Sequence, residues 1–138
     1  MKDSSGASVL DGVPPDLPEL TRAVELQQRA AHVGFDWDQL MPVLAKIREE
    51  LVELETEISG DGPQERKLDE LGDLLFAVAN LARKLELDPE QALRGTNRKF
   101  QRRFGFVESE LAKQGKYPKD TTLEEMDAIW EQAKHDEC

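Results

Sequence analysis

Two pairs of carboxylates with helical spacing are the residues of this sequence best suited to chemistry. Glu50 and Glu53 form one pair, and Glu70 and Asp73 form a second pair further along the chain. A spacing of three residues places both members of a pair near one face of an α-helix. Four ionised carboxylates in one small volume repel each other, so such a site requires divalent cations or protonation of some groups.

The segment between the two pairs contains a cluster of turn-forming residues, 59–63. If this turn folds the two flanking helices antiparallel, the pairs can face one another across a narrow groove. All-oxygen ligation favours Mg²⁺, with Mn²⁺ as a possible substitute, because these hard cations prefer carboxylate oxygens. The alternative for each pair is an ordinary solvated helix face. A carboxylate-bridged redox bundle is disfavoured, because His32 and His135 lack the Glu-x-x-His spacing and are interpreted as surface or packing residues.

A basic cluster within residues 94–103 stands out in an otherwise acidic sequence. Lys99 and Arg103 are four residues apart and share one helix face, so both can reach the same polyphosphate. Arg98 and Arg102 form a parallel pair. The alternative is that these cations pair with surplus acids of the same chain.

The elements that must position these residues are helices. Apolar residues recur at alternating steps of four and three, and no segment alternates like a strand. Asp88 before Pro89 suits a helix N-cap, and Thr122 with Glu125 forms a capping box. The fold class is therefore all-α, an antiparallel helical bundle. The predicted helices cover residues 20–33, 40–58, 68–85, 89–111 and 123–133.

The length of 138 residues fits one domain, predicted over residues 19–138. Residues 1–18 are rich in Ser, Gly, Pro and Asp, and are predicted to be a flexible leader or the remnant of an interdomain linker. A net charge of -11 argues against binding to nucleic acid. The sequence contains no apolar run of membrane-spanning length and no secretory signal, so we expect no membrane association and a cytoplasmic location. Cys138 cannot form an internal disulfide, because it is the single cysteine.

Residues 74–82 are apolar on nearly every side of their predicted helix. A small monomeric bundle covers only one face of each helix, so a second subunit is expected to cover the other face. We therefore predict a homodimer or a dimer of dimers.

Residues 20–134 resemble the catalytic C-terminal domain of the MazG nucleoside triphosphate pyrophosphohydrolases. The resemblance is carried by residues 34–37, 46–53, 70–76 and 97–100 and by Trp130. It implies an all-α fold that forms dimers or tetramers, requires Mg²⁺ and cleaves nucleoside triphosphates between the α and β phosphates. MazG proteins have two related domains, whereas this chain has one copy preceded by a linker-like segment, which is consistent with an excised domain.

Site residues carry over from the family by position. The resemblance makes Glu50, Glu53, Glu70 and Asp73 the metal ligands, and it assigns Lys99 and Arg103 to the triphosphate. Glu49 is expected to support the ligands or accept a proton, and Lys46 to be a neighbouring charge partner. The positions expected near the nucleotide are Asn80, Asn97, Trp130 and Lys134.

The function predicted from these residues is Mg²⁺-dependent hydrolysis of ribo- or deoxyribonucleoside triphosphates to a nucleoside monophosphate and pyrophosphate. In this hypothesis, water made more acidic by Mg²⁺ attacks the α-phosphorus, while Lys99 and Arg103 hold the departing pyrophosphate. A narrower alternative restricts the same chemistry to one substrate, such as dUTP, dCTP or a phosphoribosyl nucleotide. An alternative from another class is a non-enzymatic helical interaction module, which would have no metal requirement.

Overall fold

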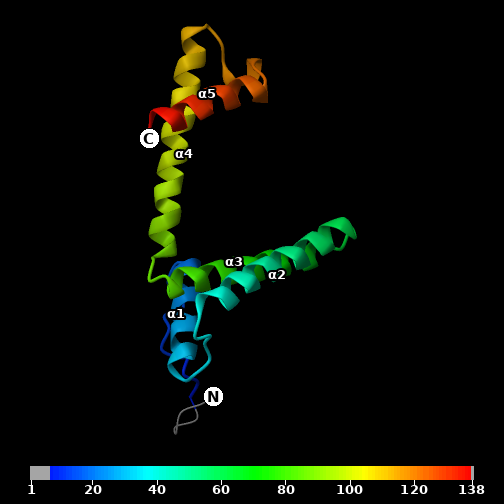
Figure 1. Ribbon diagram of the computed structural model, residues 1–138, viewed down its shortest axis with the longest axis vertical. Coiled ribbons are helices and arrows are strands. Elements are labelled where there is room, and N and C mark those ends of the chain that lie inside the picture. Colours follow the sequence, from blue (N-terminus) through cyan, green and yellow to red (C-terminus); the bar gives the residue numbers. More distant parts are fainter. Residues whose placement is uncertain (1–6, 138) are drawn as a thin grey trace. The chain divides into compact units, whose positions relative to one another are not determined.

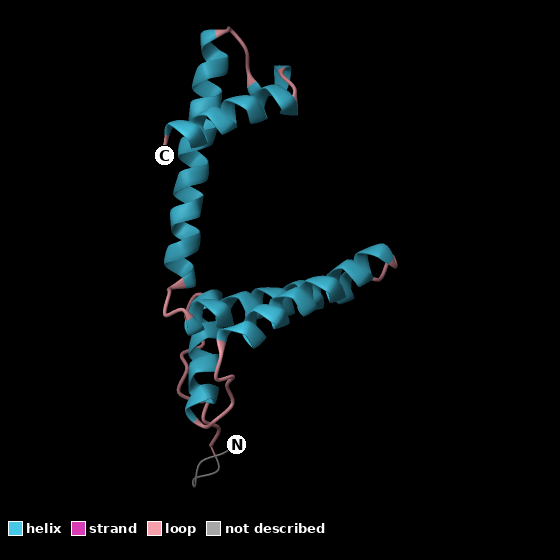
Figure 2. Cartoon of the chain, viewed as in Figure 1, coloured by secondary structure: helices cyan, strands magenta, loops and turns pink. Residues whose placement is uncertain are grey.

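The structure, a computed structural model, describes residues 7–137 (Figure 1). Residues 1–6 of the predicted leader and Cys138 lie outside the described residues. No β-strand occurs between residues 7 and 137, so the predicted all-helical fold class is confirmed (Figure 2). No helix in this range is both long and apolar enough to cross a membrane. The elements are α1 (Glu19–His32), α2 (Leu40–Ser59), α3 (Gln64–Lys84), α4 (Pro89–Lys113), the short 3₁₀ helix η1 (Pro118–Asp120) and α5 (Leu123–Asp136).

The helix ends follow the local signals in the sequence. Gly34 adopts a φ of +96° just after α1, a conformation that glycine tolerates and other residues rarely adopt. Asp88 Oδ1 accepts a hydrogen bond from the Glu90 backbone N–H at 2.9 Å, and Thr122 Oγ1 accepts one from the Glu125 backbone N–H at 3.1 Å. Both predicted N-caps are therefore present. The 3₁₀ helix η1 was not predicted and lies within the expected break between α4 and α5.

The chain divides into two compact units, one ending at Glu90 and the other beginning at Gln91, and each is described by itself. In the first unit, α2 and α3 pack side by side as an antiparallel hairpin, and α1 packs against α3 (Figure 1). Gln27 on α1 ties these helices together, because its side-chain amide donates to the Phe76 backbone carbonyl at 3.3 Å. Residues 7–18 form turns ahead of α1, with Val13 buried.

The second unit consists of most of α4 together with η1 and α5. The Phe100 ring on α4 lies 5.3 Å, centroid to centroid, from the Trp130 ring on α5. Phe104 stacks on Phe100 one turn further along α4, at 6.1 Å between centroids. Val107 and Leu111 are fully buried, and this apolar packing joins α4 to α5.

The sequence was misleading about which face of the α2–α3 hairpin is buried. The leucine stripe of α2 and α3 was expected to face the core, but most of its members are exposed, and the exposed fraction of Leu75 is 48%. Its members Leu44, Ile47 and Leu54 are half-buried. The buried positions of the hairpin are Val43 and Glu50 on α2 and Ala77, Ala79 and Asn80 on α3. Small and polar residues occupy the seam because the hairpin covers each helix on one side only. The exposed stripe consists of Leu40, Leu51 and Ile58 on α2 and Leu68, Leu71, Leu75 and Val78 on α3.

Candidate functional site

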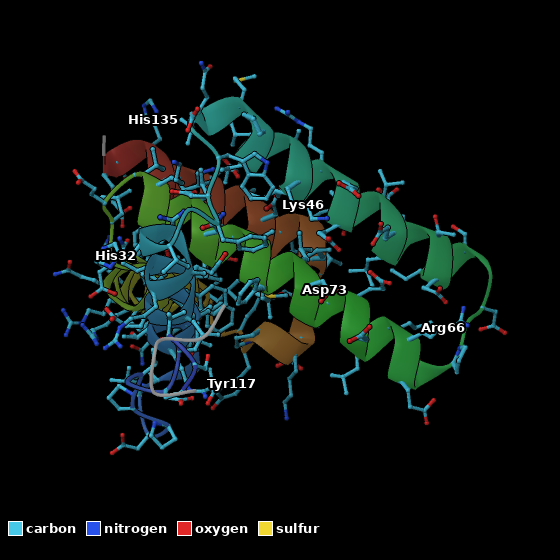
Figure 3. All side chains as sticks on the ribbon, turned by 90° about the horizontal axis from the view of Figure 1, so that it is seen from below. His32, Lys46, Arg66, Asp73, Tyr117 and His135 are labelled. Carbon is cyan, nitrogen blue, oxygen red and sulfur yellow. The ribbon has the colours of Figure 1, made fainter. Side chains whose placement is uncertain are left out.

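The two predicted carboxylate pairs meet on the α2–α3 hairpin. Carboxylate oxygens of Glu50, Glu53 and Glu70 all lie within 4.8 Å of one another, and Glu70 forms a second such group with Asp69 and Asp73. We call these five residues the acidic cluster. Figure 3 shows Asp73 on α3 beside the part of α2 that carries Lys46, with Arg66 close to the turn that joins the helices. The helical spacing of the pairs therefore brings the acids together as the sequence predicts.

Buried oxygens without partners mark the centre of the acidic cluster. Glu50 is 6% exposed, although it is a carboxylate. Oε2 of Glu50 and Oε2 of Glu70 are both buried and accept no hydrogen bond from the described residues. An unpartnered buried carboxylate oxygen is costly, and a hard divalent cation bound between such oxygens would remove that cost. The cluster thus fits a cation bound by oxygen ligands.

The electrostatics of the acidic cluster lead to the same conclusion. Burial raises the pKa of Glu70, and the nearby charges of Glu53, Asp73 and Glu50 raise it further. Burial also raises the pKa of Asp73, with added repulsion from Asp69 and Glu50 and a smaller opposing effect from Lys46. Raised pKa values mean that the ionised carboxylates lack the solvent and the protein cations that would stabilise their charge. A bound divalent cation would reverse both shifts.

One protein cation does reach the cluster. Lys46 Nζ lies 3.1 Å from Oε1 of Glu50, one turn away on α2, and 3.6 Å from Oε2 of Glu49. Glu49 itself is largely exposed and lies outside the acidic cluster. Lys46 therefore has the position of the charge partner that the sequence predicts, whereas the role expected for Glu49 remains a prediction.

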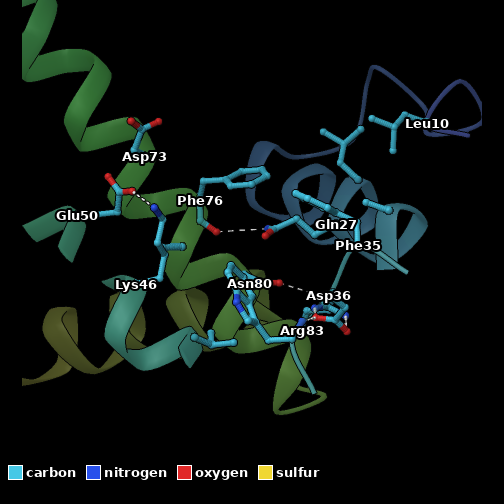
Figure 4. A pocket seen from close by; sticks show the side chains of 15 residues that line it. Leu10, Gln27, Phe35, Asp36, Lys46, Glu50, Asp73, Phe76, Asn80 and Arg83 are labelled. Carbon is cyan, nitrogen blue, oxygen red and sulfur yellow. Dashed lines mark hydrogen bonds and ion pairs between the residues drawn. The ribbon is translucent and has the colours of Figure 1, made fainter. Parts of the chain in front are cut away.

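A cavity of about 700 Å³ adjoins the acidic cluster and lies within the first unit. Its volume is within the usual range for small-molecule sites. Glu50 and Asp73 line one end, and Asn80 and Arg83 line the other (Figure 4). The aromatic side chains that line the same cavity are Phe35, Trp37 and Phe76. The site thus combines an acidic end, apolar walls and a polar far end.

A hydrogen-bonded network organises the polar end of the cavity. The Arg83 guanidinium binds both carboxylate oxygens of Asp36, at 2.6 and 3.3 Å, and its Nε donates to Oδ1 of Asn80 at 2.9 Å. The hydrogen bonding of the Arg83 guanidinium to Asp36 lowers the pKa of Asp36, which keeps its carboxylate ionised. Lys84 Nζ donates to the Trp37 backbone carbonyl at 2.6 Å. The network fastens the α1–α2 connection to the C-terminal end of α3 and so positions Trp37 at the cavity.

The remaining predicted site residues belong to the second unit. Arg103 Nε donates to Oε2 of Glu137 at 2.8 Å, and the Arg103 guanidinium lies 5.8 Å from the Trp130 ring centroid. Arg102 Nε donates to the other Glu137 oxygen at 2.9 Å, so two arginines hold one carboxylate. Lys134 Nζ lies 3.8 Å from Oε1 of Glu131. Asn97 and Lys99 are exposed on α4.

Sequence reasoning did not single out several residues of this site, including the aromatic walls of the cavity and three charged residues. Asp69 joins the acidic cluster, and its position four residues before Asp73 on one helix face could have indicated this. Arg83 follows Asn80 by three residues, which places both on one face of α3. Asp36 reaches Arg83 from a position 47 residues away in the chain, and no sequence spacing indicates that contact.

Known proteins resemble this chain over part or most of its length. Residues 39–105 match the model of the MazG nucleotide pyrophosphohydrolase domain. The nucleoside triphosphate pyrophosphohydrolase of Escherichia coli is 45% identical over 131 residues, which is 94% of this chain and 50% of that protein.

Two further relatives extend the comparison. The nucleoside triphosphate pyrophosphohydrolase/pyrophosphatase MazG of Thermotoga maritima is 40% identical over 133 residues, 96% of this chain and 51% of that protein. The uncharacterized protein YabN of Bacillus subtilis is 44% identical over 137 residues, 99% of this chain and 28% of that protein. The chain spans about half the length of the enzymes named here. The matched domain model and these identities over most of its length show that this chain carries a MazG nucleotide pyrophosphohydrolase domain.

Proposed function

We propose that this chain hydrolyses nucleoside triphosphates between the α and β phosphates, using Mg²⁺ held by Glu50, Glu53, Glu70 and Asp73. The observation that carries the proposal is the pair of buried, unpartnered oxygens, Oε2 of Glu50 and Oε2 of Glu70, inside the acidic cluster. Glu50 and Asp73 also line the adjoining cavity, so a bound cation and a bound nucleotide would be neighbours. The names of the Escherichia coli and Thermotoga maritima relatives support the reaction class.

In the proposed reaction, a water oxygen bonds to the α-phosphorus and the bond from that phosphorus to the bridging oxygen breaks. The products are a nucleoside monophosphate and pyrophosphate, and the water proton is released. Bound Mg²⁺, or Mn²⁺ in its place, supplies Lewis acidity and neutralises phosphate charge. Glu50, Glu53, Glu70 and Asp73 hold the cation, and Lys46 balances part of the charge on Glu50.

The cavity is proposed to bind the nucleoside. Trp37 and Phe76 offer apolar surface for a flat ring, and Asn80 offers a polar group at the far end. The resemblance to the family, rather than the structure, supports the assignment of Lys99 and Arg103 to the triphosphate. The same holds for the positions of Asn97, Trp130 and Lys134 near the nucleotide. Restriction to one nucleotide, such as dUTP or dCTP, is an expectation of the same kind, and the cytoplasmic location remains an expectation from the sequence.

A second copy of the chain is proposed to complete the α2–α3 hairpin, as a homodimer or a dimer of dimers. The exposed leucine stripe supports this proposal, because large apolar side chains exposed along one pair of helices are typical of an interface. Leu51, Leu71 and Leu75 would be buried by such a partner.

Product analysis tests the reaction directly. The purified chain is incubated with a panel of ribo- and deoxyribonucleoside triphosphates and Mg²⁺, and the products are separated by ion exchange. We expect monophosphate and pyrophosphate, and no turnover in EDTA. Formation of diphosphate and orthophosphate would contradict the proposed bond cleavage, and turnover in EDTA would contradict the metal requirement.

Two substitutions test the metal ligands. Glu53→Gln and Asp73→Asn are expected to lower turnover by about 100-fold or more, because each removes a charged ligand while keeping the shape of the side chain. The helical circular dichroism signal should stay unchanged in both variants. Glu55→Gln is the matched control, since Glu55 is exposed on α2 and lies outside the acidic cluster, and its turnover should equal that of the wild type.

A further inference from the structure

We propose that Asn80 acts on the bound base as a hydrogen-bond donor, and that Arg83 is the positioning residue that holds it in this role. As a consequence, the cavity favours bases with a keto group over bases with an amino group at the same position. The inference rests on the proposed function, because it assumes that the cavity binds a nucleotide.

The orientation of the Asn80 amide follows from its neighbour. Arg83 Nε carries a hydrogen and can only donate, so the Asn80 atom 2.9 Å away must be the amide oxygen. The Arg83 side chain is 7% exposed, and its other two donating nitrogens are bound to Asp36. Rotating the amide by half a turn would leave the buried Arg83 Nε facing an N–H group. Arg83 and Asp36 therefore hold the amide in one orientation.

This orientation leaves the amino end of Asn80 available to a ligand. Asn80 is 6% exposed and lines the cavity, while its oxygen accepts from Arg83. No acceptor for the amino nitrogen is found among residues 7–137, and this nitrogen is not one of the buried unpartnered atoms, so it is accessible from the cavity. A ligand that displaces water from this donor must offer an acceptor in its place, because a donor left unpaired on binding is costly. A ligand that presents an N–H group here would instead leave two donors facing each other.

The walls of the cavity indicate which part of the nucleotide supplies the acceptor. Trp37 and Phe76 line the same cavity and offer aromatic surface to a planar ring. A base bound between these residues reaches Asn80 with an edge, where a keto oxygen accepts and an exocyclic amino group donates. A sugar oxygen could supply the same acceptor. Varying the base and the sugar independently distinguishes these two sources.

The test compares ITP with ATP, which carry a keto and an amino group, respectively, at position 6 of the purine. Steady-state kcat/KM is measured with Mg²⁺ on the whole chain, and the affinities of IMP and AMP are measured by calorimetry. We expect both measurements to favour inosine by roughly tenfold, because the keto oxygen of inosine would accept from the Asn80 amino group, whereas the amino group of adenosine would oppose it. UTP and CTP provide the pyrimidine counterpart, and ITP with dITP tests the sugar.

Three variants separate positioning from packing. Asn80→Asp keeps the shape of the side chain but removes its donor, so the inosine preference should fall by roughly tenfold, with a smaller effect on ITP:dITP. Arg83→Lys keeps the positive charge beside Asp36 but loses the Nε donor, so it should lower the ITP:ATP ratio of kcat/KM and the IMP:AMP affinity ratio together. Arg66→Lys is the matched control, because Arg66 pairs with Glu57 near the hairpin turn and does not line the cavity, so its ITP:ATP ratio should equal that of the wild type.

The outcomes are distinguishable. Equal affinity of the wild type for IMP and AMP would overturn the inference even if triphosphates are hydrolysed as proposed. An Asn80→Asp variant that loses its ITP:dITP discrimination but keeps its ITP:ATP ratio would overturn it in favour of a sugar contact. The absence of hydrolysis with every triphosphate would contradict the proposed function, and the calorimetric comparison would still decide on the base preference.

Discussion

The ammonium of Lys46 lies 3.1 Å from Oε1 of Glu50, and this ion pair is the contact through which the most buried acid of the cluster meets a protein cation. The other oxygen of Glu50 has no protein partner within the described residues. One oxygen of this carboxylate is thus paired with Lys46, and the other oxygen is available to a metal ion. The predictions below follow from this arrangement and from the surfaces around it.

Removal of the Lys46 charge should destabilise the metal-free protein. The Glu50 side chain is 8% exposed and that of Lys46 is 41% exposed. Lys46→Met therefore leaves the buried Glu50 carboxylate without the ammonium that balances its charge. We expect a loss of about 1–2 kcal/mol in the free energy of unfolding in EDTA, between the values typical of exposed and buried pairs. Urea denaturation measures it, and Mg²⁺ should reduce the loss. Lys113→Met, which breaks the exposed pair with Glu110, is the control and should change stability by less than about 0.5 kcal/mol.

Stabilisation by Mg²⁺ should increase with pH. The pKa values of Glu70 and Asp73 are raised above the usual 4.5 and 3.8, so their contribution to stability is fully present below those values. This contribution is lost as pH rises through the raised values, because the folded state then holds repelling charges. The melting temperature in Mg²⁺ minus that in EDTA should therefore grow as the pH rises above these usual values. Asp73→Asn should flatten this dependence, and a difference independent of pH would contradict the assignment of these acids to the metal.

Removal of the carboxylate of Glu137 should strengthen the binding of pyrophosphate. Hydrogen bonds from Arg102 and then Arg103 lower the pKa of Glu137, so it stays ionised and competes for the arginine expected to bind phosphate. Because this site is partly exposed, we expect only about a two- to fivefold gain in affinity for Glu137→Gln, measured by calorimetry with pyrophosphate and Mg²⁺. Glu110→Gln on α4 is the control. An unchanged affinity for Glu137→Gln would show that Glu137 does not compete with this ligand.

A charge in the exposed leucine stripe should disrupt self-association. Leu75 lies on the exposed face of α3, so Leu75→Glu would place a carboxylate in the predicted dimer interface. Sedimentation should show the wild type as an oligomer and the variant closer to the 15.6 kDa monomer. Leu123→Glu, at a still more exposed leucine on α5, is the control and should leave the oligomer intact. A wild-type chain that sediments at 15.6 kDa at all concentrations would contradict the prediction.

The helices and the pairing of the acids are local properties, and for that reason the sequence was sufficient to predict them. Asp88 and Thr122 cap helices through hydrogen bonds to backbone N–H groups two or three residues away. The carboxylate pairs follow from a spacing that the α-helix imposes at any position. A short turn at residues 59–63 was enough to predict that the acids of α2 and α3 face one another.

Contacts between distant segments depend on which helix faces meet, and periodicity alone does not determine this. The leucine stripe of α2 and α3 has the pattern of a buried face, yet it is exposed because the hairpin closes over Glu50, Ala77 and Asn80. The Asp36–Arg83 pair joins positions 47 residues apart, and it orients Asn80 through a hydrogen bond that no motif encodes. The chemistry available to this chain was therefore visible in its residue types. The shape and hydrogen-bonding preference of the cavity became visible only in the tertiary structure, because they arise where three segments of the chain pack together.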